Sequence, residues 1–263
     1  MTKPKVTKPK IKRAILVLSV GERPWLPVVK SMVSRYAERC DADFILERRL
    51  PTLEEFALPE LPDTPGRKNK RAYACKAYLP WKYLTSGYDQ VLMLDDTCCI
   101  SKDADNIFET VPQGTSALTI SGPEHAIDSF QHILQEIKNS QLPRLWNYNS
   151  SDYGNTGVVL YDKSAIPALT PERIIESSSL LFNRRPHQTL FYYLMNSAQT
   201  PYTMVSKNFN RVPGTNTDMD LSERKVLSSI SEIFEEDVHI YHVTGMFRKR
   251  LELIENIAQH LGY

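Results

Sequence analysis

The stretch YDQVLMLDDT, residues 88–97, decides the fold. Its four apolar residues, 91–94, form the short continuous run that is typical of a strand buried on both faces of a parallel sheet. Asp95 and Asp96 follow directly, where desolvating two neighbouring carboxylates is costly unless a cation compensates them. Because ligands of open α/β sheets bind outside the carboxyl ends of the strands, this stretch predicts a central strand that leads into a ligand site.

The residues around this strand alternate between strand and helix patterns. Residues 14–20 predict a strand, residues 26–40 an amphipathic helix, and residues 43–47 a second strand. This order indicates a strand–helix–strand unit and hence an α/β sheet. Further strands are expected at 116–121, 157–162 and 238–243, and further helices at 72–84 (kinked or restarted at Pro80), 126–138, 187–196, 221–234 and 248–261. We expect one domain over residues 13–263, preceded by a basic flexible arm, residues 1–12.

Global properties narrow the class of protein. The 263 residues carry a formal net charge of +1, so the long-range field that nucleic-acid binding uses is absent. No run of 18 apolar residues suggests a membrane span, and the basic arm lacks the apolar segment of a secretory signal. The arm is suited at most to peripheral contact with an anionic surface. The four cysteines show no CxxC spacing, which favours reduced thiols and a cytoplasmic protein.

Candidate metal ligands lie at the carboxyl ends of two predicted strands. Asp95 offers a hard oxygen ligand after the central strand, and Thr97 adds a hydroxyl. His242 lies near the end of the last predicted strand, and its imidazole completes an oxygen-rich site for Mn²⁺ or Mg²⁺. Structural readings stay open for these residues. Acids after a strand also form turns and helix caps, and a histidine within a strand is often structural.

Three further polar stretches complete the candidate site. HVTGMFRKR, residues 242–250, combines His242 with a glycine that permits close backbone approach and with cations suited to a diphosphate. DYGNTGVVLYD, residues 152–162, precedes and includes a strand, and RRPHQTLFYYLM, residues 184–195, opens a helix. An ordinary turn and a helix cap are the structural alternatives for the last two.

The order of these motifs resembles that of GT-A-fold glycosyltransferases, in particular glycosyltransferase family 8 and its small bacterial and viral relatives. YDQVLMLDDT, NTGVVLYD, HQTLFYYL and HVTGMFRKR follow one another as the corresponding family motifs do, from about residue 13 to residue 261. The resemblance implies a Rossmann-like nucleotide-diphospho-sugar transferase fold with a mostly parallel central sheet flanked by helices. It also implies a nucleotide-sugar donor, usually a UDP-sugar, a divalent metal, usually Mn²⁺, and transfer with retention to a glycan, lipid or protein acceptor.

Carried onto this chain, the resemblance assigns three groups of residues. The metal ligands are Asp95, Thr97 and His242, with Asp96 as the alternative acid. The residues near the donor sugar or in catalysis are Asn155, His187 and Gln188. The residues expected to contact the donor nucleotide and its diphosphate are Ser19, Val20, Gly21, Lys76, Asp96, Gly157, Gly245, Arg248 and Lys249.

The chain departs from the family pattern in three places. The last motif, HVTGMFRKR, lacks the family's usual K-P-W ending. The family's D-x-D motif reads Asp95-Asp96-Thr97, so one carboxylate is replaced, and His187 stands where the family has an acid. The sequence therefore leaves metal dependence open. It also leaves open a descendant that binds a nucleotide or glycan without transfer. A nucleotidyltransferase is disfavoured by the poor glycine-rich loop after the first strand. A haloacid-dehalogenase-type phosphatase is disfavoured because neither acid has a second Asp two residues on.

Overall fold

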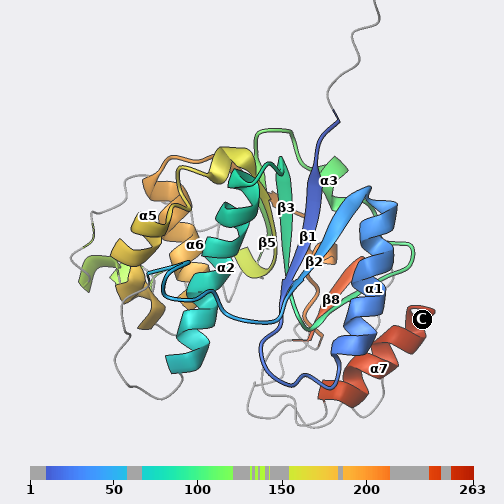
Figure 1. The fold of residues 1–263 in the computed structure, drawn as a ribbon. Helices are drawn as coiled ribbons and strands as arrows, with labels where there is room; N and C mark the ends of the chain where they lie inside the picture. The colour runs from blue at the N-terminus through green and yellow to red at the C-terminus, as the bar shows by residue number, and fades with distance from the viewer. Residues whose placement is uncertain are drawn as a thin grey trace, which may run out of the picture.

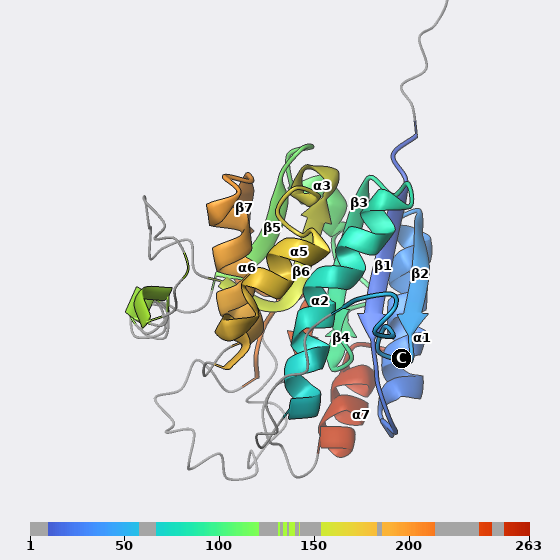
Figure 2. The same ribbon diagram turned by 60° about the vertical axis from the view of Figure 1, so that its left-hand side comes forward.

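The structure, a computed structural model, describes residues 10–57, 67–120, 154–182, 186–213, 237–243 and 250–263, with a few residues between 131 and 142. Among these residues a six-stranded sheet runs in the order β2-β1-β3-β6-β5-β7 (Figures 1 and 2). Its strands are β1 (Arg13–Leu18), β2 (Ala42–Glu47), β3 (Gln90–Asp95), β5 (Ser116–Ile120), β6 (Gly154–Asp162) and β7 (Tyr202–Val205). The mostly parallel α/β sheet predicted from the sequence is confirmed.

The first half of the sheet is parallel and places the central acids. β1 pairs in parallel with both β2 and β3, and its last residue, Leu18, lies opposite Asp95. The residue after β1 is therefore next to the carboxyl end of β3. The strand–helix–strand unit expected from residues 14–47 forms here, with α1 (Leu26–Arg39) between the two strands.

The second half of the sheet is joined through one antiparallel strand. β6 pairs antiparallel with β3 on one side and with β5 on the other, while β7 pairs in parallel with β5. The register between β5 and β6 shifts at Leu118/Thr119, opposite the beginning of β6. Because β6 runs against β3, the start of β6 lies beside the end of β3. That arrangement places the NTG segment at the same edge as Asp95.

A second, two-stranded sheet brings the C-terminal part of the chain to this edge. β4 (Cys98–Ile100) follows β3 after a two-residue turn and pairs antiparallel with β8 (Ile240–His242). In this register Cys98 lies opposite His242. The bond from the backbone N–H of Val243 to the carbonyl oxygen of Thr97, 3.1 Å long, extends the pairing into the turn. His242 thus lies close to Asp95 although the two are far apart in sequence.

Alternating side chains of the central strands form two hydrophobic cores, one on each face of the sheet. Leu92 and Leu94 of β3 belong to the core beneath α1 and α7 (Arg250–His260), which also buries β4 and β8. Val91 and Met93 belong to the core beneath α2 (Arg67–Thr85) and α6 (Pro186–Ser197). The helices in Figure 1 are divided in the same way between the two faces. Shorter helices are α3 (Ile107–Thr110), α5 (Pro171–Glu176), η2 (Lys163–Ala165), η3 (Ser178–Phe182) and η4 (Lys207–Phe209).

Several element boundaries differ from those expected from sequence. α2 begins at Arg67 and continues through Pro80, so the basic stretch 67–71 is helical and the proline does not divide the helix. β6 begins at Gly154, three residues earlier than expected, because its polar first residues pair with the end of β5. β4 and β7 were not predicted because each is short. The helix expected at 221–234, most of that at 126–138 and nearly all of the basic arm lie outside the described residues.

Two further expectations concern the cysteines and membranes. All four cysteines are unpaired and buried, as the reading of reduced thiols requires. In the part of the chain that the structure describes, no helix combines the length and the apolar character needed to cross a membrane.

Replacing Gly154 by alanine tests the packing at the β5–β6 irregularity. A Cβ atom there would lie 2.5 Å from both the Leu118 Cδ1 atom and the Thr119 carbonyl oxygen, and the backbone oxygen has little freedom to move. We expect Gly154→Ala to lower the free energy of unfolding by about 1–3 kcal/mol, measured by urea denaturation. An alanine at an unstrained site stabilises through the unfolded state. A stability equal to or above that of the wild type would therefore contradict the packing described here.

Candidate functional site

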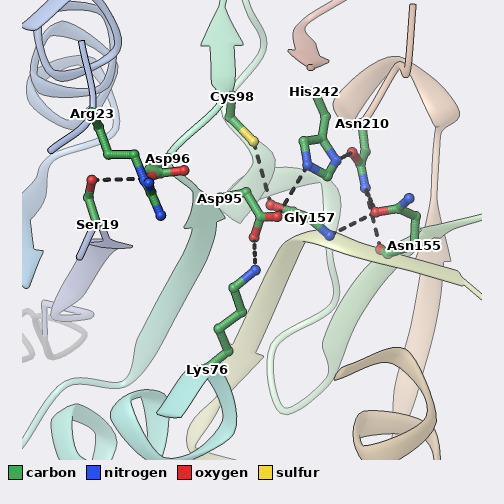
Figure 3. A network of polar contacts seen from close by, with 10 residues as sticks. All are labelled: Ser19, Arg23, Lys76, Asp95, Asp96, Cys98, Asn155, Gly157, Asn210 and His242. Carbon is green, nitrogen blue, oxygen red and sulfur yellow. Dashed lines mark hydrogen bonds and ion pairs between the residues drawn. The ribbon is translucent and has the colours of Figure 1, made fainter. Parts of the chain in front are cut away.

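The candidate site lies where the carboxyl ends of β1 and β3 meet the start of β6 and the end of β8 (Figure 3). Within it the two neighbouring acids of β3 turn to different partners. Asp96 Oδ2 accepts hydrogen bonds from Ser19 Oγ (2.9 Å) and Arg23 Nε (3.2 Å). Asp95 instead contacts Lys76 and His242. The repulsion between adjacent carboxylates is relieved because each acid has its own cation.

Asp95 is the electrostatic centre of the site. Lys76 Nζ of α2 donates to Asp95 Oδ1, and both side chains are largely buried. Burial alone would raise the pKa of Asp95, but the Lys76 ammonium holds this pKa well below its usual range. Burial likewise opposes the charge on Lys76, yet the Asp95 carboxylate leaves the pKa of Lys76 above its ordinary value. The pair is therefore ionised at neutral pH.

His242 contacts Asp95 on one side and an amide chain on the other. Its Nε2 atom lies 3.2 Å from Asp95 Oδ2 but does not meet the alignment of a hydrogen bond. Its Nδ1 atom lies 3.0 Å from Asn210 Oδ1. Asn210 Nδ2 donates to Asn155 Oδ1 at 3.0 Å, and that oxygen also accepts the Gly157 backbone N–H at 2.8 Å. One polar network thus joins α2, β3, β8 and β6 (Figure 3).

The His242 ring packs directly against the backbone of Gly157. A Cβ atom at this position would come within 2.1 Å of both Cε1 and Nδ1 of the imidazole. Contacts this short do not occur between non-bonded atoms, so any side chain at 157 would displace the ring. The glycine in the NTG motif is therefore required by the position of His242.

The loop after β1 carries a second group of charges. The Trp25 ring contacts two guanidinium groups, with Arg23 at 5.7 Å and Arg250 at 5.1 Å from the ring centre. Burial lowers the pKa of Arg250, and the positive charge of Arg23 acts in the same direction, against Asp96 and Asp95. Gly21 adopts φ +80°, a conformation that favours glycine, and its carbonyl oxygen accepts from Arg48 at 3.1 Å.

His187 and Gln188 lie at the start of α6. Gln188 Nε2 donates to the Gly154 carbonyl oxygen at 3.0 Å, which ties the helix to the start of β6. His187 is 4% exposed, and neither ring nitrogen has a hydrogen-bond partner among the described residues. Burial, together with the positive charge of Lys76, lowers the pKa of His187 to about 3, against a smaller opposing effect of Asp95. The imidazole is therefore neutral at physiological pH.

Most of the residues proposed from sequence converge on this edge. Ser19, Lys76, Asp95, Asp96, Asn155, Gly157 and His242 belong to the contacts drawn in Figure 3. Thr97 is buried in the turn between β3 and β4. Val20 packs against the core beneath α2. Gly245, Arg248 and Lys249 lie outside the described residues.

Sequence reasoning missed Asn210 and Trp25. Asn210 lies in the segment 207–211, which carries no recognisable motif, and only its pairing with β8 brings it to His242. Trp25 opens α1, where an aromatic residue is ordinarily part of the core. Arg23, two residues earlier, was the available signal, since the second arginine, Arg250, comes from the far end of the sequence.

Asp95 and His242 fit a divalent cation as two of its ligands. Among the described residues, no group of three or more His, Cys, Asp or Glu side chains is arranged to hold a metal ion. Nevertheless, Asp95 Oδ2 and His242 Nε2 lie 3.2 Å apart without a hydrogen bond between them. Two ligands at about 2.1 Å from one ion and at right angles are about 3 Å apart. The spacing is that of adjacent ligands, and the remaining positions would be left to other oxygens.

Comparison with known proteins identifies the fold. No protein-family model matches the chain, and no curated protein sequence matches it. Solved structures do. A glycosyltransferase involved in glycosylation of the major capsid of PBCV-1 is 15% identical, with a TM-score of 0.52 over 94% of this chain and 99% of that one. The galactosyltransferase LgtC, solved with donor and acceptor sugar analogues, is 13% identical, with a TM-score of 0.55 over 95% and 96%.

Mouse xyloside xylosyltransferase 1 is a third structural neighbour, 10% identical with a TM-score of 0.51 over 89% of this chain and 98% of that one. At these identities the likeness defines the fold, and the structural neighbours are glycosyltransferases. The GT-A fold expected from the order of the motifs is confirmed.

Replacing Gly157 by alanine tests whether this glycine positions the imidazole. We expect Gly157→Ala to abolish any stabilisation of the protein by Mn²⁺, because the added methyl group displaces the His242 ring. Thermal unfolding with and without Mn²⁺ measures the effect. Val159→Ala is the matched control, since it removes core contacts from the same strand without touching His242. An Mn²⁺ effect that survives Gly157→Ala would refute this role.

Proposed function

We propose that the protein transfers a sugar from a nucleotide-sugar donor, most simply a UDP-sugar, to a glycan, lipid or protein acceptor. The observation that carries the proposal is the ionised pair of Lys76 and Asp95, with His242 beside it, at the carboxyl end of β3 in a GT-A fold. Ligands of such sheets bind at this edge. We further propose that the protein acts in the cytoplasm, with the basic arm available for peripheral contact with an anionic surface.

The network supports binding of a diphosphate. Transfer breaks the bond between the anomeric carbon and the diphosphate oxygen, and the departing nucleoside diphosphate takes the electron pair. The anomeric carbon forms a new bond to an acceptor hydroxyl oxygen, and that hydroxyl gives up its proton. A bound Mn²⁺ or Mg²⁺, held by Asp95 and His242, would neutralise the charge that develops on this leaving group. Lys76 holds the Asp95 carboxylate ionised and oriented, and it adds a fixed positive charge at the same place. Arg248 and Lys249 are proposed as further diphosphate contacts.

The loop after β1 supports binding of the nucleotide. Ser19, Val20 and Gly21 follow the strand directly and are proposed to line the nucleoside. Asp96 accepts hydrogen bonds from Ser19 and Arg23 and so holds this loop in place. Asp95 is instead proposed to bind the cation that contacts the diphosphate. The two arginines that flank Trp25 add positive charge beside this loop, which favours a phosphate-bearing ligand.

The opposite side of Asp95 is proposed to receive the donor sugar. Asn155 and Gln188 are both held at the start of β6, one by the Gly157 N–H and the other by the Gly154 carbonyl oxygen. His187 presents a neutral imidazole whose nitrogens are not used by the described residues. We propose that these residues contact the sugar. Retention of configuration is proposed on the resemblance to family 8, and we assign no nucleophile.

A second candidate function is binding of a nucleotide or glycan without transfer. It is favoured by Thr97, which replaces a carboxylate of the family motif, and by the absence of a third His, Cys, Asp or Glu ligand beside Asp95 and His242 among the described residues. Turnover separates the two functions. Release of UDP from a UDP-sugar, with or without an acceptor, supports transfer, whereas tight binding of the donor without release supports the alternative.

Thermal unfolding in the presence of nucleotides tests the proposed donor class. We expect UDP with Mn²⁺ to raise the melting temperature, since a ligand at 100 times its Kd stabilises the folded state by about 2.7 kcal/mol. GDP and CMP are the competing nucleotides. His242→Ala should remove the Mn²⁺-dependent part of the shift, and Asp103→Asn, an exposed acid near the site's strand β4, is the control that should keep it. No shift with any nucleotide in the presence of Mn²⁺ would count against the transferase.

A further inference from the structure

Asn210 is held rigidly against His242 by backbone pairing. Asn210 directly follows η4 in the chain. The next residue, Arg211, exchanges backbone hydrogen bonds with β8. Arg211 N–H donates to the Ile240 carbonyl oxygen and His242 N–H to the Arg211 carbonyl oxygen, both at 2.8 Å. Asn210 is 6% exposed and His242 is 3% exposed, so water does not compete for their contact. The hydrogen bonds of these two side chains are therefore made within the protein.

Three hydrogen bonds link Gly157 to His242 through the side chains of Asn155 and Asn210, and we call this series the relay. The direction of each bond follows from the Gly157 backbone N–H. The Gly157 backbone N–H can only donate, so the Asn155 atom 2.8 Å away must be the oxygen. That oxygen also faces the Asn210 amide at 3.0 Å, which must therefore present its nitrogen. The Asn210 oxygen is then turned towards His242 Nδ1, 3.0 Å away, and this nitrogen must carry a proton.

We propose that Asn210 is a positioning residue that places the proton on His242 Nδ1 and thereby turns the Nε2 lone pair towards Asp95. The proton on one imidazole nitrogen is set by the hydrogen bond which that nitrogen makes. Nε2 and Asp95 Oδ2 then face each other as two acceptors at 3.2 Å in a buried place, an arrangement that a divalent cation stabilises. The catalytic meaning of this assignment rests on the proposed function; the assignment itself does not.

Without Asn210, the His242 imidazole can adopt the other tautomer, with its proton on Nε2. An imidazole with its proton on Nε2 would present an N–H group to Asp95 Oδ2, 3.2 Å away, and its nitrogen could no longer bind the cation. Asn210 therefore decides between two states of the same pair, a hydrogen bond between the residues or a pair of ligands. The relay to Gly157 adds a second restraint, because the glycine that supports the ring also fixes the amide that orients it.

Nitrogen-15 NMR of the histidine side chains tests the assignment in the metal-free protein, with His242→Gln identifying the signal. In mildly alkaline buffer we expect a protonated Nδ1 and an unprotonated Nε2 in the wild type. Asn210→Leu should move the proton to Nε2. Asn210→Asp keeps an acceptor for Nδ1 and should keep the wild-type tautomer. Asn208→Ala, two residues away and outside the relay, is the matched control.

Binding of Mn²⁺ alone, measured from the electron paramagnetic resonance signal of the free ion, supplies the second readout. Loss of an outer-shell partner typically weakens metal affinity about 10- to 100-fold, and we expect this loss for Asn210→Leu but not for Asn210→Asp or Asn208→Ala. If Asn210→Leu does not fold, Asn155→Ala removes the 3.0 Å bond that orients the Asn210 amide, leaves only the 3.4 Å bond to the Asn155 carbonyl oxygen, and should shift the tautomer and the Mn²⁺ affinity in the same direction.

A wild-type His242 with its proton on Nε2 alone would overturn the proposal. Unchanged Mn²⁺ affinity in Asn210→Leu, or no Mn²⁺ binding by the wild type, would overturn the link between Asn210 and a cation site. Neither readout uses a nucleotide or turnover. A protein that shows the expected tautomer and Mn²⁺ affinities but transfers no sugar would therefore refute the proposed function and support the role of Asn210.

Discussion

The site depends on keeping the Asp95 carboxylate charged while it lies largely buried at the end of the central strand. Burial opposes that charge, and the Lys76 ammonium overcomes it. Removing one member of such a buried pair leaves an uncompensated charge and typically costs about 3–5 kcal/mol. The arrangement is therefore a poor way to stabilise a fold but a good way to present a fixed, ionised oxygen to a cation.

The strand pairings around β3 bring three other segments of the chain to this carboxylate. A parallel neighbour, β1, brings the loop that follows it to the end of β3, and the antiparallel β6 brings the start of the NTG segment from the opposite direction. The small β4–β8 sheet then delivers His242 from near the C-terminus, and Gly157 leaves the space that the imidazole fills. Residues from distant parts of the chain meet there because the direction of the strands, not their distance in sequence, decides which strand ends lie together.

The sequence was sufficient for elements with strong local patterns. The buried run before Asp95 and the unit from β1 to β2 were predictable because apolar periodicity alone identifies them. The antiparallel direction of β6, the pairing of three-residue β4 with β8, and the place of Asn210 depend on tertiary contacts that leave no local pattern. The different partners of Asp95 and Asp96 could not be predicted either. Strand alternation points the two side chains in different directions, but it does not reveal that Lys76 contacts one and Arg23 the other.

The most direct test of the account is a crystal structure of the protein with Mn²⁺ and UDP, with the ion located by its anomalous scattering. The account predicts one strong anomalous peak between Asp95 Oδ2 and His242 Nε2, with phosphate oxygens completing its coordination and Asn210 Oδ1 still bonded to Nδ1. Bound UDP without that peak, or a peak whose ligands exclude Asp95 and His242, would contradict it.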